Sequence, residues 1–299
     1  MLIKILVATA ASLMPITGAL SQDGARAYHL VPAGTDIVSL TATFVHAEVG
    51  GSVFDVGVLT PTYRGTIDVL GNSGAFLVGM PIGSLSASID TGNGILDVET
   101  DPAQGDLFVG GVWGFLGSPS LSPMDYAQYK PGLRGSVAAK LFLPTGDYDS
   151  SRLLNLGGNR WSLQASLPFS YVLGDTMIDP ELTTFEIMPV VQIFGDNEDP
   201  LAPATVTSQD PVWGVEGHIT RTLSPTVWAA IDGYYEFGGE TSADGVRRGD
   251  AQEVLSLGAT LGLVLSPAVA LRLSYDEVVY SSAPDTAGRH LEITSAYSF

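Results

Sequence analysis

The chain contains no cysteine among its 299 residues. A disulfide scaffold, a thiolate metal centre and a cysteine nucleophile are therefore excluded. Basic residues are also scarce, since 13 Lys and Arg stand against 32 Asp and Glu, and the formal net charge is -19. A nucleic-acid-binding surface needs clustered cations to displace counterions from phosphates, so we expect no nucleic-acid partner.

Long hydrophobic runs are missing as well, although apolar residues make up 45% of the chain and charged residues only 15%. That charged share lies well below the roughly 25% of an ordinary soluble domain. No internal run approaches the roughly 20 apolar residues of a membrane helix. This combination predicts β-strands in a lipid bilayer, with a large soluble β-protein as the alternative.

The first residues have the features of an export signal. Lys4 supplies a positive charge, residues 5–19 form a short apolar stretch, and Ala19-Leu20-Ser21 is a small-x-small cleavage site. We therefore expect a signal peptide at 1–21, with an uncleaved anchor as the alternative. Residues 22–34 are then expected to form an N-terminal periplasmic segment that precedes a barrel at 35–299.

Apolar and polar residues alternate along the mature chain in segments of about 10 to 15 residues, the length of a transmembrane β-strand. The clearest is 160–173, where Trp161, Leu167 and every other odd position is apolar while the even positions are mostly polar. Segments 133–143 and 251–265 show the same split. One face of each strand suits lipid and the other suits water.

The same rule predicts an all-β fold, a transmembrane antiparallel up-and-down β-barrel of about 12 strands. Long acidic connections at 91–104, 147–159, 196–210 and 239–250 are expected outside the cell. The stretch 117–132 is expected on the periplasmic side with a short helix at 124–129. The predicted strands are 35–48, 52–66, 74–89, 105–116, 133–143, 160–173, 182–195, 211–222, 226–238, 251–265, 268–281 and 289–299.

The last strand ends at an aromatic residue, Phe299, which shares a face with Leu291, Ile293 and Tyr297. Such an ending resembles the signal recognised by the bacterial barrel-insertion machinery, which we expect as a partner. The location expected for the chain is the outer membrane of a Gram-negative bacterium, in contact with its lipid and lipopolysaccharide.

Charged residues on the water-facing positions mark the expected lumen, because an Arg or Lys facing lipid costs roughly 2–4 kcal/mol at the midplane. They either line a solute path or form a salt-bridged plug, and the sequence leaves both open. For His218 we expect a hydrogen-bonded lumen residue. The candidates are Arg134, Lys140, Arg160, Glu186, Glu216, His218, Asp232, Glu236, Arg272 and Asp276.

Catalytic and metal-binding alternatives are weaker. His46 near Ser52 is a suggestive hydrolase pair, but no complete triad is visible. The acidic turn Gly146-Asp147-Tyr148-Asp149 lacks the ligand spacing of a calcium loop, although divalent ions bridging to lipopolysaccharide stay open. We expect no enzymatic activity, no metal site and no cofactor.

Several motifs point to one family. They are Arg26-Ala27-Tyr28, Val31-Pro32-Ala33-Gly34-Thr35, the run Pro144, Thr145, Gly146, Asp147, Tyr148 and Asp149, the run Asn159, Arg160 and Trp161, and shorter matches near 209–211, 217–218, 228–232 and 244–247. Together they resemble the MetA-pathway phenol-degradation family of outer-membrane barrels. The resemblance implies a passive channel for small hydrophobic or aromatic solutes. The alternatives are a structural or adhesive barrel with a plugged lumen and, less favoured, an outer-membrane hydrolase.

Overall fold

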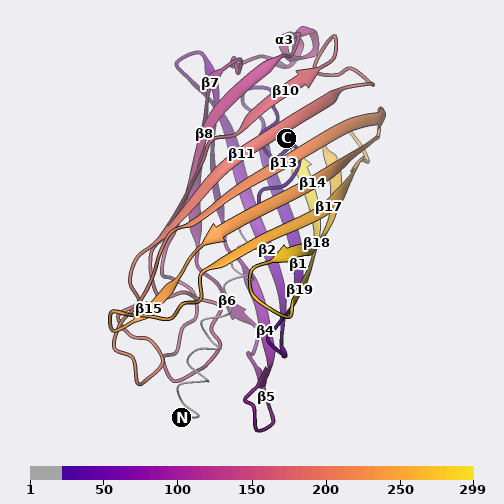
Figure 1. Ribbon diagram of the computed structural model, residues 1–299. Helices are drawn as coiled ribbons and strands as arrows, with labels where there is room; N and C mark the ends of the chain where they lie inside the picture. The colour runs from indigo at the N-terminus through magenta and orange to yellow at the C-terminus, as the bar shows by residue number, and fades with distance from the viewer. Residues whose placement is uncertain (1–21) are drawn as a thin grey trace.

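The computed structural model describes residues 22–299, so the expected signal peptide at 1–21 lies outside the described residues. Nearly all regular structure in the described chain is β-strand (Figure 1). The elements are β1 (Asp36–Val49), β2 (Ser52–Val69), β3 (Asn72–Gly79), β4 (Ile82–Asp90), β5 (Ile95–Glu99), β6 (Ala103–Gln104), β7 (Phe108–Leu116), α3 (Pro123–Gln128), β8 (Leu133–Phe142), β9 (Ser162–Ser166), β10 (Phe169–Leu173), β11 (Thr183–Phe194), β12 (Thr207–Gln209), β13 (Val212–Ser224), β14 (Val227–Gly238), β15 (Thr241–Ala243), β16 (Val246–Arg247), β17 (Gln252–Val264), β18 (Val269–Ser281) and β19 (Thr286–Ser298).

The main sheet closes on itself as an antiparallel barrel. β1 pairs with β2 on one side and with β19 on the other, from Ile37 opposite Ser298 to Val49 opposite Thr286. When β3 with β4, and β9 with β10, are each counted as one interrupted strand, the circuit has twelve strands. The predicted twelve-stranded barrel is therefore confirmed.

Prolines interrupt two of the predicted strands. β3 and β4 both pair with β2 and are separated at Met80-Pro81. β9 and β10 both pair with β8 and β11 and are separated at Leu167-Pro168. Proline has no N–H to give to a sheet, so each ladder breaks there. The alternation that predicted single strands continues across both breaks.

Side chains of the barrel wall alternate between the outer and the inner face, as the two-residue period of a strand requires. On the outer face Ile219 is 52% exposed and Ile231 is 70% exposed, while on the inner face Thr220 and Asp232 are buried. The predicted alternation is also confirmed at the start of β8, where Leu133 is exposed and Arg134 is buried. The barrel thus presents an apolar outer surface and encloses a polar interior.

The two ends of the barrel differ. The end where β1 begins and β19 finishes is termed the turn end, and Asp36 N donates to Phe299 O there at 2.9 Å. Short connections and α3 lie at this end (Figure 1). Ser122 caps α3, accepting a hydrogen bond from Asp125 N at 3.2 Å, which confirms the helix predicted at 124–129 to within a residue.

The opposite end, termed the loop end, carries β5 and β15 (Figure 1). The segment expected as a loop at 91–104 instead contains β5, which pairs with β4, and β6. The expected loops at 196–210 and 239–250 contain β12, β15 and β16, which form a small separate sheet. These long connections thus contain short strands, because backbone groups there pair with one another. No helix within residues 22–299 is long and apolar enough to span a membrane.

Depth in the bilayer should decide how well the outer face tolerates charge. Ile231 lies near the middle of β14, whereas Leu265, 60% exposed, lies in the turn between β17 and β18. We expect Ile231→Arg to destabilise the barrel by roughly 2–4 kcal/mol and Leu265→Arg by about 0–1 kcal/mol. Reversible urea unfolding in lipid vesicles measures both, and equal losses would place Ile231 outside the membrane interior.

Candidate functional site

The N-terminal residues 22–30, here termed the luminal segment, lie inside the barrel. Asp23 N and Gly24 N donate to the Glu216 carboxylate at 3.2 and 3.3 Å, and Arg26 N donates to Glu186 Oε2 at 2.9 Å. A segment without its own secondary structure must find partners for its buried N–H groups, and these inward carboxylates supply them. Residues 22–34 were predicted as a periplasmic segment that precedes the barrel, and these hydrogen bonds place residues 23–26 of it in the lumen.

Side-chain contacts fix the luminal segment from several strands. The Arg26 guanidinium donates to Thr220 and Thr222 at 3.0 Å each and lies over the Trp228 ring, 4.6 Å from its centroid. Lys140 forms an ion pair with Asp23. The motif Arg26-Ala27-Tyr28 is therefore the part of the chain that docks in the lumen.

Arg272 holds the same segment from β18. Its Nη1 donates to Asp23 O at 3.1 Å, and its Nη2 forms an ion pair with Glu292. Gly24 lies directly against this guanidinium, because a Cβ at residue 24 would come within 3.1 Å of Nη1, and its φ of +76° belongs to the left-handed region. Glycine is needed here for both reasons.

Two histidine–aspartate pairs line the inner face beyond the luminal segment. His218 Nδ1 lies 2.7 Å from Asp232 Oδ1, and His290 Nδ1 lies 2.8 Å from Asp276 Oδ2. Thr260 Oγ1 donates to Asp232 Oδ2 at 2.6 Å. His218, expected as a hydrogen-bonded lumen residue, is buried and hydrogen-bonded to Asp232. These paired groups form a polar network along one side of the lumen, in which Nε2 of His290 is buried without a hydrogen-bond partner in the described chain.

A cavity of about 570 Å³ remains beside the luminal segment. Its two walls differ in chemistry. Hydroxyl-bearing side chains from β1, β2 and β19 line one wall, and mainly apolar or aromatic side chains, with Lys140 and Asp106 among them, line the other. The hydroxyl wall includes Ser39, Thr41, Thr43, Thr60, Thr62 and Thr294, and the apolar wall includes Leu77, Pro81, Phe108, Val112, Phe142 and Leu156.

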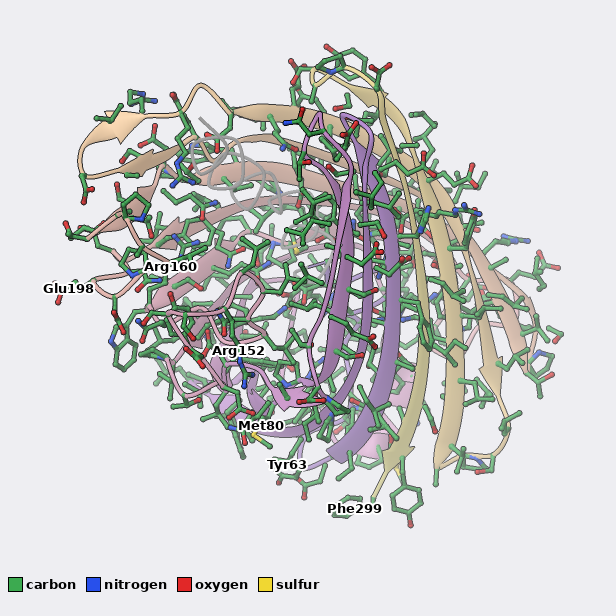
Figure 2. The ribbon with its side chains drawn as sticks, turned by 90° about the horizontal axis from the view of Figure 1, so that it is seen from below. Tyr63, Met80, Arg152, Arg160, Glu198 and Phe299 are labelled. Carbon is green, nitrogen blue, oxygen red and sulfur yellow. The ribbon has the colours of Figure 1, made fainter. Side chains whose placement is uncertain are left out.

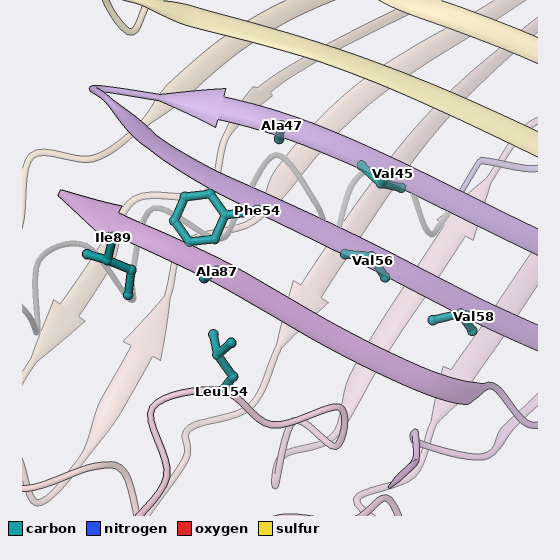
Figure 3. Close-up of a cluster of buried hydrophobic side chains, with 8 residues drawn as sticks. All are labelled: Val45, Ala47, Phe54, Val56, Val58, Ala87, Ile89 and Leu154. Carbon is teal, nitrogen blue, oxygen red and sulfur yellow. The ribbon is translucent and has the colours of Figure 1, made fainter. Parts of the chain in front are cut away.

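Hydrophobic side chains cover the cavity towards the loop end. Leu154, from the connection between β8 and β9, packs against residues on the inner faces of β1, β2 and β4 (Figure 3). Phe54 and Ile89 are the most deeply buried of these and are 1% and 0% exposed. Part of the connection 147–159 thus folds inward. The cluster comprises Val45, Ala47, Phe54, Val56, Val58, Ala87, Ile89 and Leu154.

Asp106 clasps this connection at both of its ends. Its Oδ1 accepts from Gly146 N and its Oδ2 accepts from Gly158 N, both at 2.9 Å. Thr145 Oγ1 also accepts from Leu107 N at 3.1 Å. Gly146 and Gly157 touch, since a Cβ on either would lie within 2.7 Å of the other's backbone. The motif around Pro144 and Gly146 therefore holds the inward fold in place.

The two aspartates of this motif accept hydrogen bonds from nearby backbone N–H groups. Asp147 accepts from Gln104 N at 2.7 Å, and Asp149 accepts from Ser151 N and Oγ at 2.8 and 2.6 Å. The bonds from Ser151 lower the pKa of Asp149 below its usual value. Both carboxylates therefore accept hydrogen bonds that hold the loop backbone in place.

Neighbouring motif residues join the loops at the rim. Tyr148 OH donates to Asp199 O at 2.8 Å, and Asn159 Nδ2 donates to Asn197 Oδ1 at 2.8 Å. Trp161, in the same motif, is 54% exposed on the outer face. Seen from the loop end, Glu198 lies at the periphery of this rim (Figure 2). The motif thus joins the connections 147–159 and 196–210 by hydrogen bonds.

Arg160, expected in the lumen, is not among the residues that line the cavity of about 570 Å³. Its guanidinium lies 4.6 Å from the centroid of the Phe194 ring and donates to Gln209, at the loop end (Figure 2). Burial lowers its pKa to about 10, so it remains protonated at neutral pH. The alternation along 160–173 predicted a polar environment for Arg160, and its partners there are Gln209 and the Phe194 ring.

The other predicted lumen residues lie on the inner face, in separate places. Lys140 and Arg272 line the main cavity, whereas Arg134 lines a small cavity of about 20 Å³ with Glu186 and His218. A third cavity, of about 40 Å³, is lined by Glu236 and Asp276. Glu216 and Asp232 belong to the polar network already described.

Sequence reasoning missed several residues of the lumen. Arg64 and Glu292 line the cavity, and the alternation in 52–66 and 289–299 could have found both. The role of Asp106 carried no such signal, since it depends on a loop that folds back upon it. The luminal segment was equally hidden, because it has no periodic pattern.

The suggested hydrolase pair is not brought together. Ser52 is 2% exposed and its Oγ accepts from Asp90 N on the inner face, whereas His46 points outward and its Nδ1 lies 2.7 Å from Asp55 Oδ1. A serine nucleophile would need its Oγ within hydrogen-bond reach of the histidine. The two residues therefore form no catalytic unit.

The fold and the lumen define the chain as a β-barrel of the outer-membrane type. Residues 33–289 match the family described as "Putative MetA-pathway of phenol degradation", and the chain belongs to that family. No curated protein sequence matches the chain.

Two solved structures show the same fold. An outer membrane channel from Pseudomonas putida F1 is similar with a TM-score of 0.73 and 19% identity over 91% of this chain and 98% of that one. The translocator domain of the autotransporter NalP from Neisseria meningitidis is similar with a TM-score of 0.51 and 12% identity, over 97% of each chain. A channel and a translocator domain thus share this architecture.

The Asp106 clasp predicts a change in the exposed loop. Asp106→Asn replaces one acceptor by an NH2 group that faces a backbone N–H, so one hydrogen bond is lost and two donors are opposed. We expect trypsin to cleave after the exposed Arg152 at least several-fold faster. Asp101→Asn, an exposed position in the neighbouring connection, is the control. Equal cleavage rates in the two variants would show that Asp106 does not hold the loop.

Proposed function

We propose that the chain is an outer-membrane channel for the passive uptake of small hydrophobic or aromatic compounds. The observation that carries this proposal is the cavity of about 570 Å³ inside the barrel, with one apolar wall. That volume lies within the roughly 300–1,000 Å³ of small-molecule sites. Membership of a family named for phenol degradation supports the same class of solute.

The same proposal assigns the surroundings of the barrel. The exposed apolar outer face fits lipid, and the loop end, with its acidic connections, would face lipopolysaccharide outside a Gram-negative cell. The C-terminal strand would present Phe299, 61% exposed and stacked with Tyr297, to the barrel-assembly machinery. Charged lumen residues such as Lys140 and Arg272 would line the solute path.

The luminal segment bears on the alternative of a plugged structural barrel. It occupies the polar side of the lumen, where Glu216 and Glu186 bind it, and this should block hydrated solutes. The hydrophobic cluster around Leu154 covers the cavity at the loop end. An apolar solute can replace contacts between such side chains, whereas an ion would lose its hydration there. These features favour a channel that selects apolar solutes.

Filling the cavity should slow uptake. Ser39 lines the cavity, and its neighbour Val38 points to lipid with 46% exposure. In Gram-negative cells that carry the protein in a lipopolysaccharide-containing outer membrane, we expect faster accumulation of radiolabelled naphthalene than in cells without it. Ser39→Trp should reduce this gain several-fold and Val38→Trp should leave it intact. No gain in the wild type would overturn the channel proposal.

Releasing the luminal segment should open the polar side. Gly24→Val places a branched side chain against Arg272 at a positive φ, so the segment should leave the lumen. We expect ionic conductance in planar bilayers to rise several-fold. Gly34→Val carries the same backbone strain, at φ +78°, with nothing within 4 Å of its Cβ, and should conduct like the wild type. Identical conductance of all three proteins would mean that the segment does not restrict ion flow.

A further inference from the structure

Arg64 has hydrogen-bonding capacity that the described chain leaves unused. It projects from the inner face of β2, and its Nη1 donates to Ala27 O at 2.9 Å. Its Nε is buried and has no hydrogen-bond partner. No Asp or Glu within residues 22–299 forms an ion pair with it. Arg64 is thus a cation in the lumen without a counter-charge in contact.

The other basic side chains along the cavity have charged or aromatic partners that Arg64 lacks in residues 22–299, although Nε of Arg272 is also buried there without a hydrogen-bond partner. Lys140 is paired with Asp23, and Arg272 is paired with Glu292. Arg26 donates to two threonine hydroxyls and lies over an indole ring. Since a buried charge is costly unless it is paired, the mismatch at Arg64 favours an anion in the adjoining cavity.

The neighbours of Arg64 in the sheet register are apolar. Ile37 and Leu77 are its directly opposed partners on β1 and β3, and all three line the cavity. Side chains directly opposite one another have Cβ atoms about 4.5–5.5 Å apart. The guanidinium therefore stands between two hydrophobic side chains and could hold the head of an amphipathic molecule whose body avoids water.

The next row of the register supplies an aromatic surface. Thr62, two residues before Arg64 on β2, is opposed by Gly79, which is opposed by Phe108, which is in turn opposed by Phe142. The two phenylalanine rings lie with centroids 5.5 Å apart. Gly79 keeps the row open, because a Cβ there would come within 2.4 Å of the Phe108 ring. A hydroxyl and an aromatic pair thus flank the same space.

We infer that Arg64 binds the carboxylate of a small amphipathic organic acid whose apolar body lies against Leu77, Phe108 and Phe142. The planar guanidinium matches a carboxylate in both charge and geometry. Thr62 adds a hydroxyl that can donate to the same head group. This inference rests on the proposed channel function and specifies one class of solute that the cavity holds.

The test compares an acid with a neutral analogue of the same size. Calorimetry on protein in lipid nanodiscs, with empty nanodiscs subtracted, measures the affinities for 4-phenylbutyrate and 4-phenylbutanol. We expect the wild type to bind the acid at least about tenfold more tightly, and Arg64→Gln to lose most of that preference. Arg289→Gln, which removes the same charge from the outer face of β19, should keep it.

A second variant separates binding from docking of the luminal segment, since Arg64 also contacts Ala27. Arg64→Lys keeps a cation and a donor but lacks the planar fork, so its affinity for the acid should fall between those of the wild type and Arg64→Gln. Cleavage by trypsin after Arg26 reports whether the segment stays docked. An intermediate affinity with an unchanged cleavage rate would support a direct contact with the carboxylate.

Three outcomes overturn the inference. They are equal affinities of the wild type for acid and alcohol, an unchanged preference in Arg64→Gln, and an equal loss in Arg289→Gln. Each leaves the channel proposal standing if naphthalene uptake is observed. Failure of naphthalene uptake together with binding of neither ligand would instead remove the proposed function itself.

Discussion

Backbone groups inside a bilayer have no water to bond with, and the closure of β1 onto β19 meets that demand. The ladder runs from Ile37 opposite Ser298 to Val49 opposite Thr286, so neither terminal strand keeps a free edge in the membrane. Once the sheet is closed, the two-residue period of each strand sends alternate side chains to lipid and to the lumen. An apolar outer wall and a charged interior follow together.

The charged interior determines what can fill the barrel. Carboxylates such as Glu216 and Glu186 are enclosed in the lumen, and they accept hydrogen bonds from N–H groups of the luminal segment. That segment brings Asp23 to Lys140 in return. Arg64, which lines the remaining cavity, has no carboxylate of the described chain in contact. The luminal segment therefore fills the polar side of the lumen and leaves a cavity lined by both a cation and apolar side chains.

The loop end selects solutes by the same cost of desolvation. Asp106 holds both ends of the connection that places Leu154 over the inner faces of β1, β2 and β4. A hydrated ion arriving there would lose water without gaining partners, whereas an apolar molecule would exchange one set of dispersion contacts for another. Asp106, the hydrophobic cluster around Leu154 and the apolar wall of the cavity therefore favour apolar solutes over hydrated ions.

The sequence alone determined the barrel, its twelve strands and the inward placement of residues such as Lys140, Glu216 and Asp232, because alternation is a local property of a strand. Only the tertiary structure decided where Arg160 ends up, how Leu154 turns inward and that residues 22–30 enter the lumen. Those placements depend on contacts between distant parts of the chain, such as Arg26 with Glu186, 160 positions apart. No local pattern encodes such a pairing, since it exists only after the sheet has closed and its buried charges need partners.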